Sequence, residues 1–472
     1  MNNRIIVVEF NELCPQLLEK WMAQGVLPNF KAFHDTAQVF ITKPCVPEQQ
    51  FLEPWIQWYS MHTGLGYDQH KVFNLADGPQ ANFPDIWSVL SEAGLPVGNC
   101  GSMNARGFNK PGSYFLPDPW CTSEKASPDE LQAFHDFVSY SVREYTNADA
   151  HLGRTIYSSF LKFMFKHGIG IGTVATIVKQ LAQERVLDQR ASWKRAAILD
   201  QLQFDIFAHY QKTMKPAFST FFANSTAHLQ HAYWRNMDPD SFQLKPSEKD
   251  QALYGGAISF GYRKMDALLG RFVQLAANDT TVIFASGLSQ QPYLKSEGIG
   301  GQRFYRPKDL QSLLKLWDIS FTDVQPTMTH QFQIRFANPE DLSKARRTLE
   351  SVTCDGDAVF GFGNTDGNSL YVGCQLRQLL GAAAQIVIGG RNMTTGFYDE
   401  FYLIDATKSG FHHPDGALWI KTGSHGVHRE KVSVLDLFPT LLNHFGVPMP
   451  TLPGIRYKGR DLMPLIEQDV AA

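Results

Sequence analysis

The sequence has little cysteine and no paired cysteine motif. Its 472 residues include six cysteines, and no two of them are separated by only two residues. Such scattered cysteines argue against a zinc site built from thiolates and against a dithiol redox motif. We therefore expect reduced thiols, which are typical of a cytoplasmic protein.

Long uninterrupted apolar runs are also missing. The N-terminus enters a strand-like apolar run directly, without the basic stretch and small-residue cleavage site of a secretory signal peptide. The stretch Phe160–Val178 is apolar, but Lys162, Lys166 and His167 make it too charged for a membrane-spanning helix. We expect a pair of buried helices here and no integral membrane segment, with contact to a membrane surface as the alternative.

Neither sign of charge dominates the chain. The 43 basic and 46 acidic residues give a formal net charge of −3, so the whole molecule is not drawn to nucleic acid or to an anionic membrane. We expect a small-molecule or glycoconjugate ester as the partner, and no nucleic acid. Nothing in the sequence indicates the oligomeric state.

Apolar runs of strand length alternate with longer helical patterns along most of the chain. With 43% hydrophobic residues, the chain is long enough to bury a large core. The alternation predicts an α/β fold, a doubly wound and mostly parallel sheet with helices on both faces. We expect strands at Arg4–Phe10, Val97–Cys100, Ala217–Ala223, Thr281–Ala285, Gln385–Ile388 and Ala417–Ile420. We expect helices at Cys14–Gln24, Phe51–His62, Pro84–Glu92, Trp193–Thr213, Ala227–Arg235, Asp250–Leu275 and Val434–Phe445.

Two long insertions interrupt this alternation. The first, about 117–215, is rich in aromatic residues and mostly helical in pattern. The second, 298–377, predicts a small α+β module with a helix at Pro339–Val352. Its strands are expected at Thr329–Phe336, Ala358–Phe362 and Ser369–Gln375. We interpret 1–297 and 378–472 as the core, and the module either as a cap over the active site or as an appendage that only adds stability.

Several motifs occur in the order that is typical of one enzyme superfamily. They are the opening run Arg4–Glu12, the stretch Leu17–Phe30, the pattern W-x-S-x-x-T-G at Trp58–Gly64 followed by His70, the segments Thr226–Trp234, Tyr262–Gly270 and Val282–Ser286, the G-x-H pattern at Gly410–Gly416, and Val434–Gly446. In this order, the motifs resemble those of the alkaline phosphatase superfamily, in particular its type I phosphodiesterase and nucleotide pyrophosphatase branch. The resemblance covers the core segments and implies an alkaline phosphatase-like fold.

The resemblance also implies a kind of chemistry. Members of the superfamily hold two divalent cations that clamp the oxygens of a phosphate or sulfate ester while a Thr or Ser attacks. One cation takes an Asp after the first strand, the nucleophile and an Asp-His pair. These positions here are Asn11, Glu53 or Pro54, Gly287 and Leu288. Asparagine offers only a neutral oxygen, and glycine and leucine offer no ligand, so we expect no two-metal centre.

The position of the second cation keeps more of its ligands. The resemblance places them at Ala227, His231 and His412, so both histidines remain. His228 lies three residues before His231, on the same face of the segment if it is helical. One transition metal, zinc or manganese, could bind to His228, His231 and His412, with Glu9 or a water completing the site. The alternatives are structural histidines, or imidazoles that act as acid or base without a metal.

Two carboxylates complete the predicted site. Glu53 stands at the expected start of a helix, where backbone N–H groups favour an anion. It is either a partner of the helix dipole or a replacement for the nucleophile, as a general base or a covalent nucleophile. Side-chain alternation along the first strand places Glu9 and Asn11 on one face. We predict Glu53, Asn11, His231 and Glu9 as catalytic residues, and a common cleft for Asn11, Glu53, His231 and His412.

These features lead to one main functional hypothesis and two alternatives. The main hypothesis is a hydrolase or group transferase that acts on a phosphate or sulfate ester or a glycoconjugate, with an altered one-metal or metal-free site. The first alternative is a catalytically inactive pseudoenzyme that binds a ligand or a protein through the same cleft. An ordinary two-metal phosphodiesterase is the third possibility, and the fold alone does not decide among them.

Overall fold

A nine-stranded sheet forms the centre of the core. The computed structural model describes residues 1–48, 51–75, 77–144, 147, 151–186, 189–276, 278–327, 330–404 and 408–470. Strand β1 (Arg4–Phe10) lies between β5 (Phe218–Ala223) and β6 (Thr280–Ser286) and is parallel to both. Strand β19 (Gly416–Lys421) is antiparallel to its neighbours β6 and β2. The other strands are β2 (Ala37–Lys43), β3 (Val97–Cys100), β4 (Tyr114–Leu116), β20 (Gly426–Val427) and β21 (Val432–Ser433). The predicted mostly parallel sheet is confirmed.

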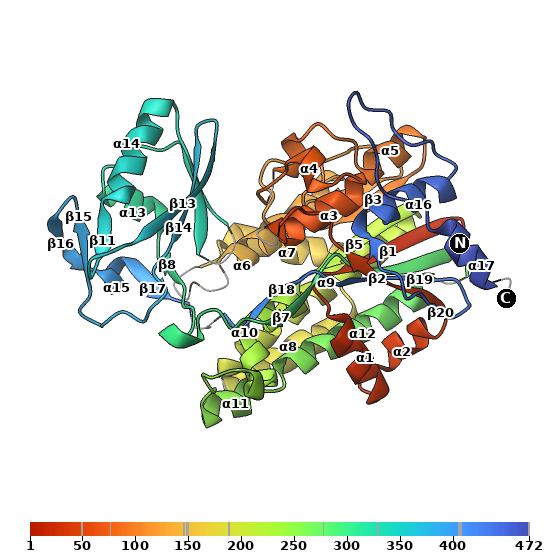
Figure 1. The fold of residues 1–472 in the computed structure, drawn as a ribbon, viewed down its shortest axis with the longest axis horizontal. Coiled ribbons are helices and arrows are strands. Elements are labelled where there is room, and N and C mark those ends of the chain that lie inside the picture. Colours follow the sequence, from red (N-terminus) through yellow and green to blue (C-terminus); the bar gives the residue numbers. More distant parts are fainter. Residues whose placement is uncertain are drawn as a thin grey trace.

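Helices cover both faces of this sheet (Figure 1). Because side chains alternate along β1, Ile6 and Val8 enter one hydrophobic cluster, while Ile5 and Val7 enter the other. The first cluster packs against α1 (Pro15–Ala23), α2 (Pro28–His34), α9 (Ala196–Thr213), α10 (Ser225–Met237) and α12 (Ala257–Ala276). The second packs against α3 (Pro54–Thr63), α5 (Ile86–Glu92), α16 (Leu437–His444) and α17 (Met463–Val470).

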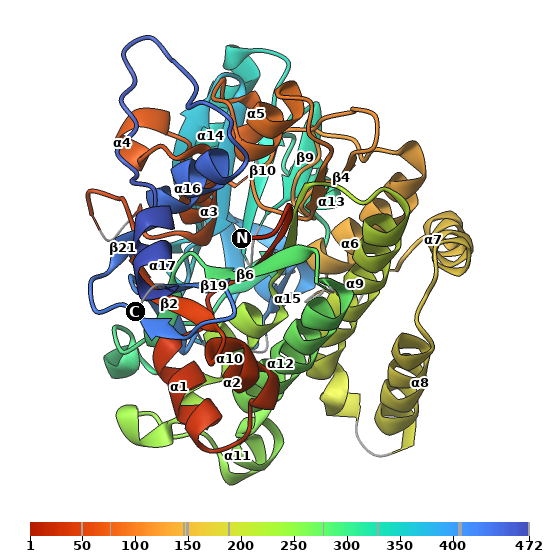
Figure 2. The same cartoon turned by 90° about the vertical axis from the view of Figure 1, so that its right-hand side faces the viewer.

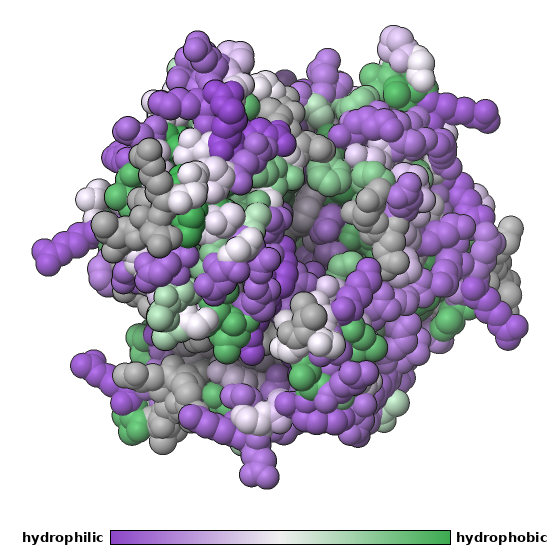
Figure 3. Space-filling view, turned by 60° about the vertical axis from the view of Figure 1, so that its left-hand side comes forward, coloured by the Kyte–Doolittle hydropathy of each residue, from purple (hydrophilic) through white to green (hydrophobic). Residues whose placement is uncertain are grey.

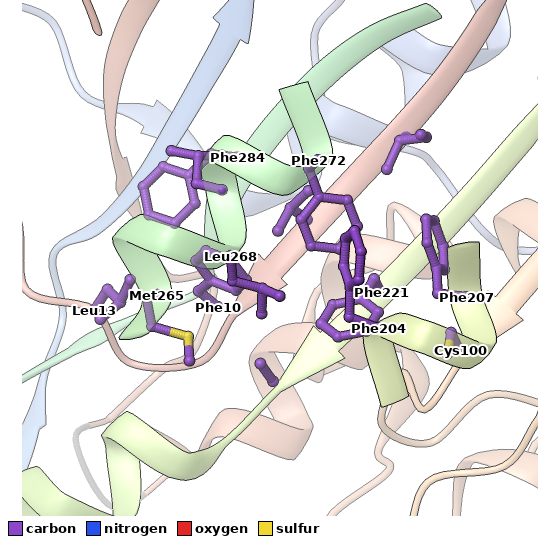
Figure 4. Packing of buried hydrophobic residues seen from close by; sticks show 14 of the residues in the cluster. Phe10, Leu13, Cys100, Phe204, Phe207, Phe221, Met265, Leu268, Phe272 and Phe284 are labelled. Carbon is purple, nitrogen blue, oxygen red and sulfur yellow. The ribbon is translucent and has the colours of Figure 1, made fainter. Parts of the chain in front are cut away.

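Aromatic rings fill the centre of the first cluster (Figure 4). Phe272 on α12 is fully buried. Its ring centroid lies 4.7 Å from that of Phe204 and 4.9 Å from that of Phe221. The rings of Phe10 and Phe207 complete the group around it. Helices α9 and α12 are therefore held against the sheet by ring-to-ring packing.

The first insertion is helical, as the sequence predicted. It contains α6 (Gln132–Arg143), α7 (Arg154–Lys166), α8 (Ile171–Val186) and α9. Figure 2 shows α7 and α8 at the edge of the molecule, outside α9. Among the described residues, no helix combines the length and the apolar content needed to cross a membrane.

The second insertion is an α+β module that lies apart from the core sheet, on the left in Figure 1. Its first four-stranded sheet contains β9 (Asp323–Pro326), β10 (Gln331–Arg335), β13 (Phe360–Asp366) and β14 (Ser369–Cys374). Its second contains β11 (Val352–Cys354), β12 (Asp357–Ala358), β15 (Gln385–Ile388) and β16 (Arg391–Gly396). Two further strands, β8 (Tyr305–Pro307) and β17 (Phe401–Leu403), pair with each other. The helices of the module are α13 (Leu310–Leu316), α14 (Pro339–Glu350) and α15 (Phe397–Glu400).

One predicted core strand belongs to this module. The segment Gln385–Ile388 was expected among the core strands, but it pairs with β11. The hydrophobic cluster of the module runs from Tyr305 to Phe401, beyond the sequence-based boundary at 377. A short apolar strand carries no information about the sheet that it joins, so its local pattern could not separate the two placements.

A buried histidine makes the stability of the core depend on pH. His70 Nδ1 accepts a hydrogen bond from the Val72 backbone N–H at 3.0 Å, and His70 Nε2 lies 3.0 Å from Ser60 Oγ. The ring is therefore neutral and donates from Nε2. Burial lowers the pKa of His70 to about 3 in the folded protein. In the unfolded chain, the pKa of a histidine is about 6.5. Between these two pH values, the unfolded chain therefore binds a proton that the folded protein does not bind.

We expect this histidine to weaken the fold in acid. Since the native pKa is lowered, the stabilisation is present above about pH 6.5 and is lost as the pH falls. Between about pH 7.5 and about pH 5, the free energy of unfolding should drop by about 2 kcal/mol more in the wild type than in a His70→Gln variant. Urea unfolding at both pH values measures the difference, and parallel pH dependences of the two proteins would contradict the assignment.

Candidate functional site

Glu12 is the centre of a polar cluster just beyond the carboxyl end of β1. It is buried, and its φ of 60° lies in the left-handed region, which non-glycine residues seldom adopt. The Gln230 side-chain amide donates to its backbone carbonyl at 2.8 Å, and the Gln290 amide donates to its Oε2. Asn11 Nδ2 donates to Glu12 Oε1 at 2.9 Å. Two amides thus fix the carboxylate of Glu12, and a third fixes its backbone.

Two histidines converge on Glu12 from different elements. His231 lies on α10, and its Nε2 is 3.1 Å from Glu12 Oε2. His412 lies on β18 (Gly410–His413), which pairs with β7 (Ser289–Pro292), and its Nε2 is 3.7 Å from the same oxygen. One ligand atom from each of the three residues lies within 4.8 Å of the others. Among the described residues, this is the one group of three histidine, cysteine or acidic side chains with such convergence.

The ionisation states of the cluster suit a cation. Burial would raise the pKa of Glu12, but the neighbouring His231 and His412 outweigh it and lower that pKa to about 2. Burial lowers the pKa of His412 to about 4, although Glu12 opposes this shift. At neutral pH the cluster therefore offers an anionic carboxylate and a neutral imidazole, the forms in which these groups bind metals.

The donor set fits one divalent transition metal. His231 Nδ1 lies 3.1 Å from the Gly410 carbonyl oxygen, so a proton on Nδ1 is held there and Nε2 is left to face Glu12. Two imidazole nitrogens and one carboxylate oxygen are typical ligands of zinc and manganese. Three protein ligands also leave a coordination position open, as in catalytic zinc sites.

Glu53 adjoins this cluster, as the sequence predicted that it should. It is the N-cap residue of α3, and its Oε2 is 3.5 Å from His412 Nδ1. Burial raises the pKa of Glu53 to about 8, and the charge of Glu12 adds to the shift while Lys408 opposes it. The side chain is nevertheless 30% exposed. Glu53 is therefore placed between the histidine and the solvent.

Asn11 supports the cluster from the side of α3. Its Oδ1 accepts a hydrogen bond from Trp58 Nε1 at 2.8 Å. Its Nδ2 donates to Asn224 Oδ1 at 2.8 Å as well as to Glu12. Both ends of the amide are engaged, so Asn11 orients the carboxylate of Glu12 and is not itself one of the converging ligands.

The structure leaves two predicted site residues outside the converging group. Glu9 is buried on the α3 side of the sheet, where its Oε1 lies 2.8 Å from His62 Nε2. His228 is half-buried on α10, and burial lowers its pKa to about 4. Neither contributes a ligand atom to the group formed by Glu12, His231 and His412.

Glu12 is the residue that the sequence argument missed. The motif resemblance places the acidic position after the first strand at Asn11, one residue before Glu12. The available signal was an acidic residue two positions beyond the end of a buried strand, at the edge where ligands bind in parallel sheets. The carboxylate that converges with His231 and His412 therefore comes from Glu12, after β1, and not from α10.

Positive side chains gather beside the cluster. Lys408 Nζ lies 4.8 Å from the ring centroid of Phe411 and 5.2 Å from that of Tyr293. Burial lowers the pKa of Lys408; Glu53 and Glu12 oppose that shift, and Arg377 of the module reinforces it. Figure 3 shows the face that carries the module as largely hydrophilic, with a hollow near its middle. Lys408 therefore places positive charge near Glu53, and Arg377 of the module adds positive charge near Lys408.

A separate cavity lies far from this chemistry. Its volume is about 490 Å³, and Met1, Asn2 and Thr280 are among its lining residues. These residues stand at the amino ends of β1 and β6, whereas Glu12 follows the carboxyl end of β1. We assign the site to the cluster because its ligand atoms converge there.

No known protein-family profile and no curated protein sequence matches this chain. Solved structures are similar to it at low identity. Phosphonoacetate hydrolase from Sinorhizobium meliloti 1021, in complex with phosphonoformate, is 11% identical over 92% of this chain and 94% of its own, with a TM-score of 0.44. Murine ectonucleotide pyrophosphatase/phosphodiesterase 5 is 11% identical over 96% and 97%, with a TM-score of 0.39. A mutant of the alkaline phosphatase PafA is 12% identical over 98% of both chains, with a TM-score of 0.46.

Proposed function

We propose that this protein hydrolyses small phosphate esters at a site where Glu12, His231 and His412 hold one divalent transition metal. The observation that carries the proposal is the convergence of three ligand atoms within 4.8 Å at the carboxyl edge of the sheet. When bound, such an ion supplies Lewis-acid polarisation of a phosphoryl oxygen. The ligand set allows one ion rather than a pair, which makes the site an altered version of the one that the motifs imply.

The side chains around the cluster have separate tasks. Asn11 and Gln290 orient the Glu12 carboxylate by donating one hydrogen bond to each of its oxygens. The Gly410 carbonyl holds the ring of His231. Glu53 adjoins His412 and is partly exposed, so it is the group placed to exchange a proton with a bound ester.

The positive side chains define the substrate class. Lys408 faces Glu53 and Glu12, and Arg377 reaches the same region from the module. A phosphate ester is anionic, so these charges offset the repulsion that the ionised Glu12 exerts on it. A neutral ester would gain nothing from them.

Metal analysis combined with turnover of nitrophenyl phosphate mono- and diesters tests the proposal. We expect stoichiometric zinc or manganese and measurable hydrolysis.

A Glu53→Gln variant should lose about a hundredfold or more in kcat, the usual contribution of a general acid or base. A Lys408→Ala variant should raise KM about tenfold, since it removes a charge that binds the ester before reaction, while Lys315→Ala on the exposed side of α13 should change neither constant. A protein with neither metal nor turnover would instead be the inactive ligand-binding member.

A further inference from the structure

Two neighbouring helices of the first insertion carry an exposed apolar surface. On α8, the exposed apolar residues follow a spacing of three, four and three, which places them on one helix face. They are Ile171 at 89% exposure, Val174 at 39%, Val178 at 61% and Leu181 at 53%, and Val186, the last residue of the helix, is 79% exposed outside this spacing. On α7, Tyr157 and Phe165 are 50% and 75% exposed. Single exposed apolar residues are normal on a protein surface. A row of them along one helix face indicates a surface that binds a protein or a membrane.

The other sides of both helices are anchored to the core. On α7, the buried Phe160 stacks on Phe137 of α6, with ring centroids 3.7 Å apart. On α8, the buried Gln180 donates to the Ala191 carbonyl at 2.9 Å. Glu184, one turn further, accepts from Arg195. The exposed row is therefore the outward side of helices whose inward side is already packed.

The charge of this segment has one sign. From residue 151 to residue 183 the sequence contains no aspartate or glutamate, although acidic residues are in excess over the whole chain. Arg154, Lys162, Lys166 and Lys179 fall within it, and all four are exposed. Lys166 is paired with Glu130 of the neighbouring segment at 3.0 Å. The remaining three give the α7–α8 segment a net positive charge beside its apolar residues.

We propose that the α7–α8 segment, residues 154–186, docks on an anionic lipid surface. Helices with exposed apolar residues and flanking lysines lie in the interface of anionic membranes, where the apolar side chains enter the acyl boundary and the lysines meet the head groups. The absence of acidic residues from this stretch distinguishes between two binding partners, a second copy of the chain and an anionic surface. A second copy of the α7–α8 segment would bring like charges together, whereas an anionic surface complements them. Both helices are peripheral, which leaves room for a flat partner (Figure 2).

Co-sedimentation of the full chain with lipid vesicles tests the proposal. We expect binding to vesicles of phosphatidylcholine and phosphatidylserine at least about tenfold stronger than to phosphatidylcholine alone, and weakening with salt. A Phe165→Glu, Val178→Glu double variant should lose at least about tenfold in partitioning, because it places charge in the apolar row. A Lys162→Gln, Lys179→Gln double variant should lose about tenfold through the electrostatic contribution.

The matched control replaces equally exposed apolar residues elsewhere. Leu316 and Val427 lie outside the α7–α8 segment and are 48% and 60% exposed, and a Leu316→Glu, Val427→Glu variant should bind vesicles like the wild type. Absence of binding to the anionic vesicles, or equal binding to both lipid compositions, would overturn the proposal. So would a concentration-dependent dimer in sedimentation velocity that Val178→Glu dissociates, since the second copy would then be the occupant.

Discussion

A His231→Ala, His412→Ala double variant is expected to lose its bound metal and more than about a thousandfold of its phosphate-ester turnover. Removal of even one charge-stabilising donor costs an active site about a hundredfold to a thousandfold. This variant removes two of the three converging ligands. Glu12 alone would then bind a divalent cation weakly, because one carboxylate is a poor site for a transition metal. Elemental analysis and initial-rate measurements follow both losses.

His228 offers a matched control on the same helix. It lies three residues before His231 but is not part of the converging group. A His228→Gln variant should therefore keep stoichiometric metal and turnover within about twofold of the wild type. The one-metal assignment would be wrong if the double variant retained its metal. A loss of metal in His228→Gln would show that His228 belongs to the site after all.

A Phe272→Ala variant should lose about 3–5 kcal/mol of unfolding free energy. The ring is fully buried and touches Phe204 and Phe221 at centroid distances of 4.7 and 4.9 Å. Its removal leaves a cavity where α12 meets α9 and the sheet. Urea denaturation, followed by circular dichroism, measures the loss.

Two further variants separate cavity formation from a general effect of losing an aromatic ring. Phe272→Leu retains much of the volume and should cost less than about half as much. Phe165→Ala removes a ring that is 75% exposed and should change the unfolding free energy by less than about 0.5 kcal/mol. Equal losses for Phe272→Ala and Phe165→Ala would contradict the packing argument.

The sequence predicted the core fold well where the pattern was local. The strand Arg4–Phe10 is found at its predicted bounds because an unbroken apolar run leaves little choice. Alternation also placed Glu9 and Asn11 on one face, and both contact α3, through His62 and Trp58. The placement of Gln385–Ile388 was wrong because strand partners are set by long-range pairing, which no local pattern contains.

The site was predicted in part for the same reason. The motif order selected His231 and His412, which the structure brings to a common oxygen. Glu12 was missed because its position depends on a left-handed turn and on amides from two distant segments, Gln230 and Gln290. Glu9 was expected near the histidines, but its side chain is buried on the α3 side of the sheet, where its partner is His62.

The ribbon formed by β7 and β18 connects the inserted module to the core. The chain leaves the core through β7 and returns through β18, and the two strands pair with His412 opposite Gln290. Gln290 bonds to Glu12, and His412 faces the same oxygen. The pairing of these two strands thus completes the site in the core before the module begins. The module can change in length or sequence while the β7–β18 pair keeps Gln290 and His412 in place. This fold can therefore acquire a new recognition surface without a change in the residues around Glu12.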